Sequence, residues 1–484
     1  MRFLALGLAA LSLSVPAIAQ SELDPSLPEI RKGFEEWKAA NHVPGLVWGV
    51  VKDGTLIHVE GLGVQDIVAN RPVTADSRFR IASMSKAFTA YGVLRLQEAG
   101  KLRLDDPAAT YVPEMAGWGA GITVEQLMHH MAGFVTDDPW GDRQQVLTPA
   151  EFTAKLKAGV PFQSAPGTRY EYSNFGYATL GRVITNVSGK PYQRFVGETV
   201  FTPLGMGATT YDVKAVPRDR LAQGYRWENG QWSLEPEMRD GEFGAMGGVV
   251  TTANDYAKWV AHLLSGWPVA AKVGADGAVL RAMRAGGGLP HGRARPGKDA
   301  ADCRLQFIYA GGLVSGTDCL LGPVMFYSGG YPGYGSHMLL LPEAGVGIFA
   351  FSNRTYAAPL PPVWDAAGVL SRAGVIQARP VPLTPMLAEG YATARQVWAE
   401  GRIDVQPERL AMNMLLDRSA RNWAAELTRL KAASGACDTA VPVVPDGAMS
   451  GRFSWTCEKG RISGQILLAP TNSTRIQALR LSAQ

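Results

Sequence analysis

The chain has 484 residues, of which 46% are hydrophobic and 19% charged, and its formal net charge is +4. This is the composition of an ordinary globular protein that is long enough for two or three domains. The small net charge, without a long run of one sign, argues against a nucleic-acid partner.

The first 19 residues have the pattern of a secretory signal peptide. Arg2 precedes an apolar run from residue 3 to residue 15, and Ala17-Ile18-Ala19 form a small-x-small cleavage site. The apolar run is too short to span a bilayer, and no later stretch reaches about 20 apolar residues. We therefore expect an exported protein, periplasmic or secreted, with no membrane span.

A helix and antiparallel strands are predicted at the start of the mature chain. The apolar side chains of residues 28–41 recur at helical spacing. Strands are expected at 45–51 and 55–61, because residues 52–54 have the composition of a hairpin turn. A third strand is expected at 64–68.

Ser83 and Lys86 form an S-x-x-K pattern at the start of a helix predicted over residues 85–98. Residues three apart share a helix face, so the Lys86 amine is expected next to the Ser83 hydroxyl. A lysine in a desolvated pocket can lose its proton near neutral pH and act as the base for a serine nucleophile. The pattern also occurs by chance, and a helix start with a solvated lysine is the alternative interpretation.

A short helix is expected over residues 123–131, which contain His129 and His130. Adjacent histidines point to different helix faces, so we expect structural roles rather than a shared metal site. The following loop, 132–147, is interpreted either as the wall of a substrate site or as a turn-rich surface loop.

Tyr172 and Asn174 lie two residues apart, just before a helix that Gly189 ends. In extended backbone they would point to the same side. A phenol there can relay a proton, and an amide can orient a lysine or a substrate carbonyl. A core tyrosine followed by a helix-capping asparagine is the alternative.

The second half of the chain combines strands with a separate C-terminal module. Strands are expected at 324–329, 337–341 and 346–352, and the proline-rich segment 379–385 is read as a linker. Beyond it, helical and strand patterns predict a small α+β domain. The domain prediction is a signal peptide (1–19), a catalytic domain (20–378) and a C-terminal domain of unknown role (379–484).

The four cysteines, Cys303, Cys319, Cys437 and Cys457, do not have the spacing of a metal or redox site. Export and the closeness of each pair in sequence predict two local disulfides, Cys303–Cys319 and Cys437–Cys457. Buried free thiols are the alternative.

With these segments placed, the chain resembles the serine β-lactamase and D-alanyl-D-alanine peptidase superfamily, on the side of class C β-lactamases and the related esterases and D-aminopeptidases. Residues 83–86 match its S-x-x-K motif and residues 172–174 its Y-x-N motif. The flanking runs 127–133, 203–206 and 247–252 also resemble the family. The similarity covers about residues 29–356 and leaves out the C-terminal module.

The third motif departs from the family, which has K-T-G or H-x-G on a strand edge. Tyr327-Ser328-Gly329 stands there, with Gly330 beginning the glycine-rich continuation, and the basic residue is missing. In the family this cation helps to hold a substrate carboxylate. The departure therefore predicts weaker recognition of β-lactams and of terminal D-alanine.

The resemblance implies an α+β catalytic domain, with an antiparallel sheet flanked by helices and a helical lobe, and no metal or organic cofactor. Ser83 would attack a carbonyl, Lys86 and Tyr172 would share the proton transfers, and Asn174 would position the substrate. Backbone amides of Ser83 and Gly330 would form the oxyanion hole.

We therefore predict a serine hydrolase that forms an acyl-enzyme and cleaves small esters, amides or peptides, as an esterase or D-amino-acid peptidase. A β-lactamase or D-alanyl-D-alanine carboxypeptidase is the alternative enzyme. A catalytically silent module that binds penicillin or peptidoglycan is the alternative from another class, and the resemblance leaves the oligomeric state open.

Overall fold

The computed structural model describes residues 23–266, 275–298, 304–377 and 381–484. The chain divides into two compact units, of which the first ends at residue 378 and the second is Arg379–Gln484. Each unit has its own hydrophobic core. The expected signal peptide, residues 1–19, lies outside the described residues, and no described helix is long and apolar enough to cross a membrane.

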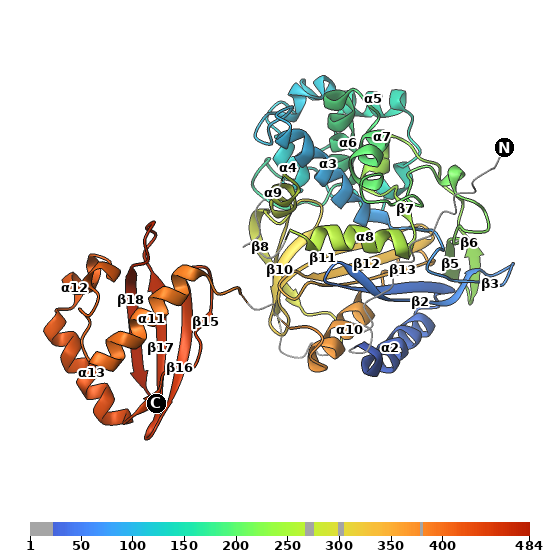
Figure 1. The fold of residues 1–484 in the computed structure, drawn as a ribbon. Helices are drawn as coiled ribbons and strands as arrows, with labels where there is room; N and C mark the ends of the chain where they lie inside the picture. Colours follow the sequence, from blue (N-terminus) through green and yellow to red (C-terminus); the bar gives the residue numbers. More distant parts are fainter. Residues whose placement is uncertain (1–22, 267–274, 299–303, 378–380) are drawn as a thin grey trace, which may run out of the picture. The chain divides into compact units, whose positions relative to one another are not determined.

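A nine-stranded antiparallel sheet forms the centre of the first unit (Figure 1). Its strand order is β3-β2-β1-β13-β12-β11-β10-β9-β8, so the N-terminal hairpin pairs with the last strand of the unit. The strands are β1 (Gly45–Lys52), β2 (Thr55–Asp66), β3 (Arg71–Pro72), β8 (Gly287–Ala294), β9 (Arg304–Tyr309), β10 (Val314–Asp318), β11 (Gly322–Tyr331), β12 (Tyr334–Leu341) and β13 (Val346–Ser352).

The separate strand predicted at 64–68 is wrong, because β2 runs on without interruption to Asp66. The glycines in this stretch do not end the strand. A Cβ atom at Gly61 would lie 2.2 Å from the Val73 carbonyl oxygen, so the glycine allows close packing of neighbouring backbone.

Helices cover both faces of the sheet, which confirms the predicted α+β class. On one face lie α2 (Leu27–Ala40) and α10 (Leu360–Arg372), and on the other lies α8 (Ala253–Leu264) (Figure 1). A helical lobe stands above α8. It contains α3 (Lys86–Glu98), α4 (Val124–Met128), α5 (Pro149–Ala158), α6 (Asn174–Ser188), α7 (Tyr192–Val196) and α9 (Ala275–Ala282).

Helix α3 is buried along nearly its whole length and packs against α6, α7 and α9. Its apolar residues do not concentrate on one side, as expected for a helix surrounded by protein. Lys86, its first residue, is therefore held inside the lobe.

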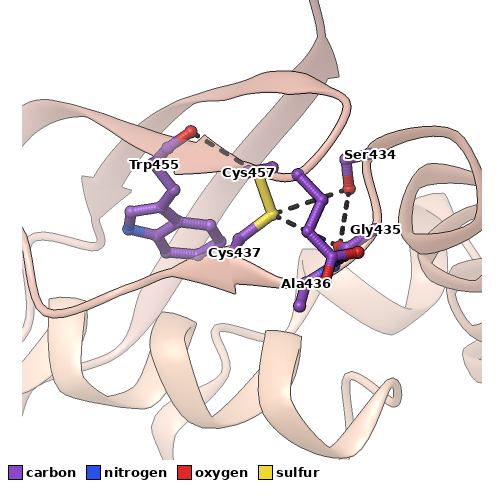
Figure 2. Close-up of a disulfide and its surroundings, with 7 residues drawn as sticks. Ser434, Gly435, Ala436, Cys437, Trp455 and Cys457 are labelled. Atoms are coloured by element: carbon purple, nitrogen blue, oxygen red, sulfur yellow. Dashed lines mark hydrogen bonds between the residues drawn. A yellow bond between two sulfur atoms is a disulfide. The ribbon is translucent and has the colours of Figure 1, made fainter.

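The second unit is a sheet covered by helices. The strands are β14 (Cys437–Asp438), β15 (Val444–Pro445), β16 (Ser450–Cys457), β17 (Gly460–Leu468) and β18 (Ile476–Ala483), and the helices are α11 (Pro385–Glu400), α12 (Asn413–Asp417) and α13 (Ala420–Ser434). Figure 2 shows the predicted disulfide between Cys437 and Cys457, which is confirmed and joins facing residues of β14 and β16. Cys303, and with it the other predicted bridge, lies outside the described residues.

Candidate active site

Ser83 lies in a tight turn between the sheet and α3. Strand β4 (Phe79–Arg80) leads into the 3₁₀ turn η2 (Ala82–Ser85), and Lys86 begins α3 directly after it. Ala82 has a left-handed backbone with φ +50°, an uncommon conformation for a residue with a side chain. Strain of this kind is frequent beside functional side chains, and here it precedes the candidate nucleophile.

The Lys86 amine is fully buried and has three hydrogen-bond partners. Its Nζ atom lies 2.7 Å from Asn174 Oδ1, 2.8 Å from the Met246 carbonyl oxygen and 3.1 Å from Ser83 Oγ. Two of these partner atoms, Asn174 Oδ1 and the Met246 carbonyl oxygen, can only accept. When Lys86 is neutral, its two N–H groups are taken by these two oxygens, and the nitrogen lone pair is left facing the Ser83 hydroxyl.

The surroundings of Lys86 favour this neutral form by lowering the pKa of the amine. Burial lowers the pKa of Lys86 from 10.5 to about 8, although nearby Asp142, Asp138 and Asp137 act against the shift. A substantial fraction of the amine is therefore neutral in mildly alkaline solution, as a general base requires.

Tyr172 completes the contacts of the serine, with its hydroxyl 2.7 Å from Ser83 Oγ. Burial, with Tyr327 and Asp138 nearby, raises the pKa of Tyr172 well above its ordinary value. The phenol thus stays protonated near neutral pH and can donate to Ser83 while Ser83 donates to Lys86. In this arrangement Tyr172 can act as a proton donor or relay, and not as an anionic base.

The Y-x-N segment is fixed at the start of α6. Ser173, not Asn174, caps this helix, because its side chain accepts from the Gly176 amide. The Asp137 carboxylate accepts from the amides of Asn174 and Phe175, at 2.7 and 2.8 Å. The Asn174 side chain is thereby free of capping and reaches Lys86.

His130 holds the backbone on both sides of Tyr172. Its carbonyl oxygen accepts from Glu171 N at 2.9 Å, and its Nδ1 accepts from Ser173 N at 3.1 Å. The rings of His130 and Tyr172 lie 4.6 Å apart between centroids. Burial keeps the pKa of His130 well below 6.5, so its ring is neutral. His130 thus holds the backbone around Tyr172 in place, which is the structural role that we expected for it.

Strand β11 passes against the serine turn. A Cβ atom at Gly329 would lie 2.3 Å from the Ile81 carbonyl oxygen, so only glycine permits this approach. Tyr327, two residues earlier, has its hydroxyl 3.1 Å from that of Tyr309, and it lies close enough to Tyr172 to help raise the pKa of that phenol. Tyr327 therefore belongs to a buried phenol cluster beside the serine.

The structure separates Ser328 from the other predicted residues. Its hydroxyl lies 2.8 Å from His337 Nδ1, and the other ring nitrogen of His337 lies 3.1 Å from Trp364 Nε1 on α10. The side chain thus points away from Ser83, and only its backbone lies near the site. Gly330 packs against the Tyr356 ring, since a Cβ atom there would lie 2.8 Å from Tyr356 Cδ1.

The loop 132–147 forms one wall of the site, and its acidic residues were not singled out as site residues from the sequence. Asp138 accepts from Asn174 Nδ2 at 3.5 Å, and Asp142 accepts from the Tyr356 hydroxyl at 3.1 Å. The only signal in the sequence was the concentration of acids and aromatics in one loop. Among the described residues, no group of three or more His, Cys, Asp or Glu side chains is arranged to hold a metal ion.

Residues 30–371 match the protein family described as Beta-lactamase. The chain belongs to this family. The match confirms the resemblance stated from the motifs.

The curated relatives cover parts of the chain. Protein flp of Staphylococcus aureus (strain N315) is 29% identical over 194 residues, which is 38% of either chain. Protein flp of strain COL is 25% identical over 324 residues, 64% of this chain and 60% of that protein. The putative penicillin-binding protein PbpX of Bacillus subtilis (strain 168) is 29% identical over 226 residues, 45% of this chain and 54% of that protein.

The chain therefore spans 38–60% of the length of these relatives. A solved structure, the octameric penicillin-binding protein homologue from Pyrococcus abyssi, matches with a TM-score of 0.59 at 19% identity and covers 95% of this chain and 98% of that one. At this identity the likeness shows the fold alone.

Proposed function

We propose that this protein is a serine hydrolase that cleaves small esters or amides through an acyl-enzyme on Ser83. The observation that carries the proposal is the pair of contacts on Ser83 Oγ, from the Lys86 amine at 3.1 Å and the Tyr172 hydroxyl at 2.7 Å. Membership of the Beta-lactamase family supports it.

In the acylation step, Ser83 Oγ attacks the substrate carbonyl carbon while its proton passes to the neutral Lys86 amine. The bond to the leaving group then breaks, and the leaving group takes a proton from Tyr172, which is recharged from Lys86. The oxyanion is held by the backbone amides of Ser83 and Gly330, and a single donor of this kind is typically worth about 10²–10³ in rate. Water then attacks the ester on Ser83 and releases the acid.

Labelling with a fluorophosphonate tests the nucleophile. We expect one phosphonyl group per chain, located on Ser83 by peptide mapping, and no label on the Ser83→Ala variant. Ser85→Ala is the matched control, because Ser85 is also buried in the same turn but contacts the Val249 amide instead of Lys86. A label on another serine, or none on a correctly folded protein, would refute the assignment.

We propose neutral substrates in preference to carboxylate-bearing ones, because Tyr327 brings a neutral phenol where the family has a cation. The loss of one charge-assisted hydrogen bond lowers affinity by up to about a hundredfold. Hydrolysis of p-nitrophenyl acetate should therefore exceed hydrolysis of nitrocefin in kcat/KM by about that factor. Efficient nitrocefin turnover with negligible esterase activity would instead support the β-lactamase alternative.

Binding of a β-lactam without turnover is the second candidate, favoured by the similarity to PbpX of Bacillus subtilis, a putative penicillin-binding protein. A stable penicilloyl adduct on Ser83, found by mass spectrometry in a protein without ester or amide hydrolysis, would support it.

We also propose export with removal of residues 1–19, which the disulfide Cys437–Cys457 supports. An N-terminus at Gln20 in the secreted or periplasmic protein would test this.

A further inference from the structure

Tyr331 lies between the two chain segments whose amides would hold the oxyanion. It ends β11 and directly follows Gly330. Its buried ring faces the Arg80 guanidinium, whose Cζ atom lies 5.4 Å from the ring centroid. Arg80 ends β4, and the turn η2 that carries Ser83 begins two residues later. Tyr331 is thus joined to one donor through the chain and to the segment of the other donor through its ring.

The Tyr331 side chain is held in place at its hydroxyl. This hydroxyl donates to Gln145 Oε1 at 2.7 Å, and both side chains are buried. Burial also raises the pKa of Tyr331, so the phenol keeps the proton that it donates. The Gln145 Nε2 atom has no hydrogen-bond partner within the described part of the chain. The bond between the two side chains therefore orients both the amide and the phenol.

The Arg80 side chain is held against the same ring. Its Nη2 atom donates to the Met238 carbonyl oxygen, and the Met238 Sδ atom lies 3.7 Å from the Tyr331 hydroxyl oxygen. A cation over an aromatic face is attracted by the charge distribution of the ring, most strongly where water is excluded. A shift of the Tyr331 ring would therefore move the side chain that leads into the Ser83 turn.

The loop that carries Gln145 also holds Gly330 from its other side. Gln145 directly follows the turn η5 (Gly141–Gln144), in which Asp142 accepts from the Tyr356 hydroxyl at 3.1 Å. The Tyr356 ring packs on Gly330. Gly330 has no side chain of its own to fix its backbone, so its orientation depends on these neighbours.

We propose that Tyr331, anchored on Gln145, is a positioning residue that sets the amides of Ser83 and Gly330 toward the oxyanion. This inference rests on the proposed hydrolase function and adds a residue to its mechanism. An oxyanion hole is effective only when its donors already point to the place where the charge develops, and a misplacement of about 1 Å can cost about a hundredfold in rate. Tyr331 is buried and acts through the backbone of Gly330 and of residues 80–83.

The substitution Tyr331→Phe tests this role, because it removes the hydroxyl and keeps the ring. We expect kcat for p-nitrophenyl acetate, per Ser83 that a fluorophosphonate can label, to fall by about tenfold to a hundredfold. Formation and hydrolysis of the acyl-enzyme both pass through an oxyanion, so both should slow together and KM should stay within about twofold. The affinity for methylboronic acid, which forms a tetrahedral adduct on a serine, should fall by the same factor as kcat. An unchanged kcat, or a higher KM with unchanged affinity for the boronic acid, overturns the proposal.

Two further variants locate the effect. Tyr334→Phe is the matched control, since Tyr334 pairs with Tyr331 in the same hairpin and donates over the same 2.7 Å, but to the Ala222 carbonyl oxygen. It should leave kcat and the affinity for the boronic acid near the wild type, and an equal loss there contradicts the proposal. Gln145→Leu should reproduce Tyr331→Phe, and the double variant should lose no more than either single variant, because both remove one bond. Losses that add would contradict the anchoring, and Gln145→Leu decides alone if Tyr331→Phe does not fold.

The rate of fluorophosphonate labelling covers the case in which the ester is not cleaved. Attack of Ser83 on the phosphorus also places charge on an oxygen in the oxyanion hole, so the labelling rate of Tyr331→Phe should fall by about tenfold or more. An unchanged rate overturns the proposal. Failure of the labelling in the wild type refutes the hydrolase function, whereas labelling that is equally fast in both proteins refutes only the role of Tyr331.

Discussion

Replacement of Lys86 by methionine tests whether burial keeps this amine largely neutral. Methionine is unbranched and of similar length, so it removes the ionisable group with little change in volume. Burial lowers the pKa of Lys86 from 10.5 to about 8. Since one pKa unit corresponds to about 1.4 kcal/mol, the ammonium form costs the fold about 3 kcal/mol at this position.

The sign of the pH dependence follows from the direction of the shift. Because the pKa in the folded protein lies below that of the unfolded chain, the folded protein binds fewer protons between about pH 8 and pH 10.5. The free energy of unfolding must therefore rise with pH across this window. We expect the wild type to gain about 3 kcal/mol relative to Lys86→Met between about pH 7.5 and pH 10.5.

Urea unfolding of both proteins at the two pH values measures this gain. Other titrating groups and the C-terminal unit contribute to both proteins, so the difference between them isolates Lys86. Lys32→Met, which removes an ammonium with a 74% exposed side chain, controls for the change in net charge. An equal pH dependence in the wild type and in Lys86→Met would show that Lys86 stays charged in the fold, and would refute its role as a neutral base.

Three further changes have expected outcomes. Tyr172→Phe removes the proton donor and should lower kcat for ester hydrolysis by about 10²–10⁴, measured at saturating p-nitrophenyl acetate, and an unchanged kcat would exclude the relay. Asp142→Asn removes an anion that raises the pKa of Lys86, so the acidic limb of the kcat/KM profile for a neutral ester should move to lower pH; a shift to higher pH would contradict this sign. Replacing Cys437 and Cys457 together by serine should destabilise the C-terminal unit by about 3 kcal/mol in the loop-entropy model, measured by urea unfolding, and no loss would count against that estimate.

The relation between Ser83 and Lys86 could be predicted because it is local. The two residues are three apart, and in the 3₁₀ turn that carries Ser83 such side chains lie nearly above one another. Strands of the C-terminal unit were also predictable, since in β16 the buried Phe453 and Trp455 alternate with the exposed Arg452 and Thr456.

The sequence offered the loop 132–147 as a possible wall of a substrate site, but not the contacts of its acidic residues, because these depend on distant segments. Asp137 is placed by the first turn of α6, and Asp142 by a hydroxyl that is 214 residues away in the sequence. Nothing in the periodicity of residues 132–147 encodes these partners. The direction of the Ser328 side chain could not be predicted from the motif either. The register between β11 and β12 pairs Ser328 with His337, and the Ser328 hydroxyl contacts that histidine instead of the site.

Tyr327 lies where an added positive charge would act on the substrate. Its hydroxyl lies among the phenols of Tyr309 and Tyr172, so the substitution Tyr327→Lys would place an ammonium close to Ser83. Such a cation attracts a substrate carboxylate, whereas the carboxyls of Asp138 and Asp142 continue to repel it.

We therefore expect Tyr327→Lys to raise the ratio of nitrocefin to p-nitrophenyl acetate hydrolysis, in kcat/KM, by less than the hundredfold expected for one charge-assisted bond. Adding Asp142→Asn should raise the ratio further, because it removes part of the repulsion. Tyr327→Phe is the control, since it removes the hydroxyl without adding charge and should leave the ratio near that of the wild type. A ratio that changes in neither the single nor the double variant would show that residue 327 on β11 does not discriminate between substrates by their charge. In that case the preference for neutral substrates would have to arise elsewhere.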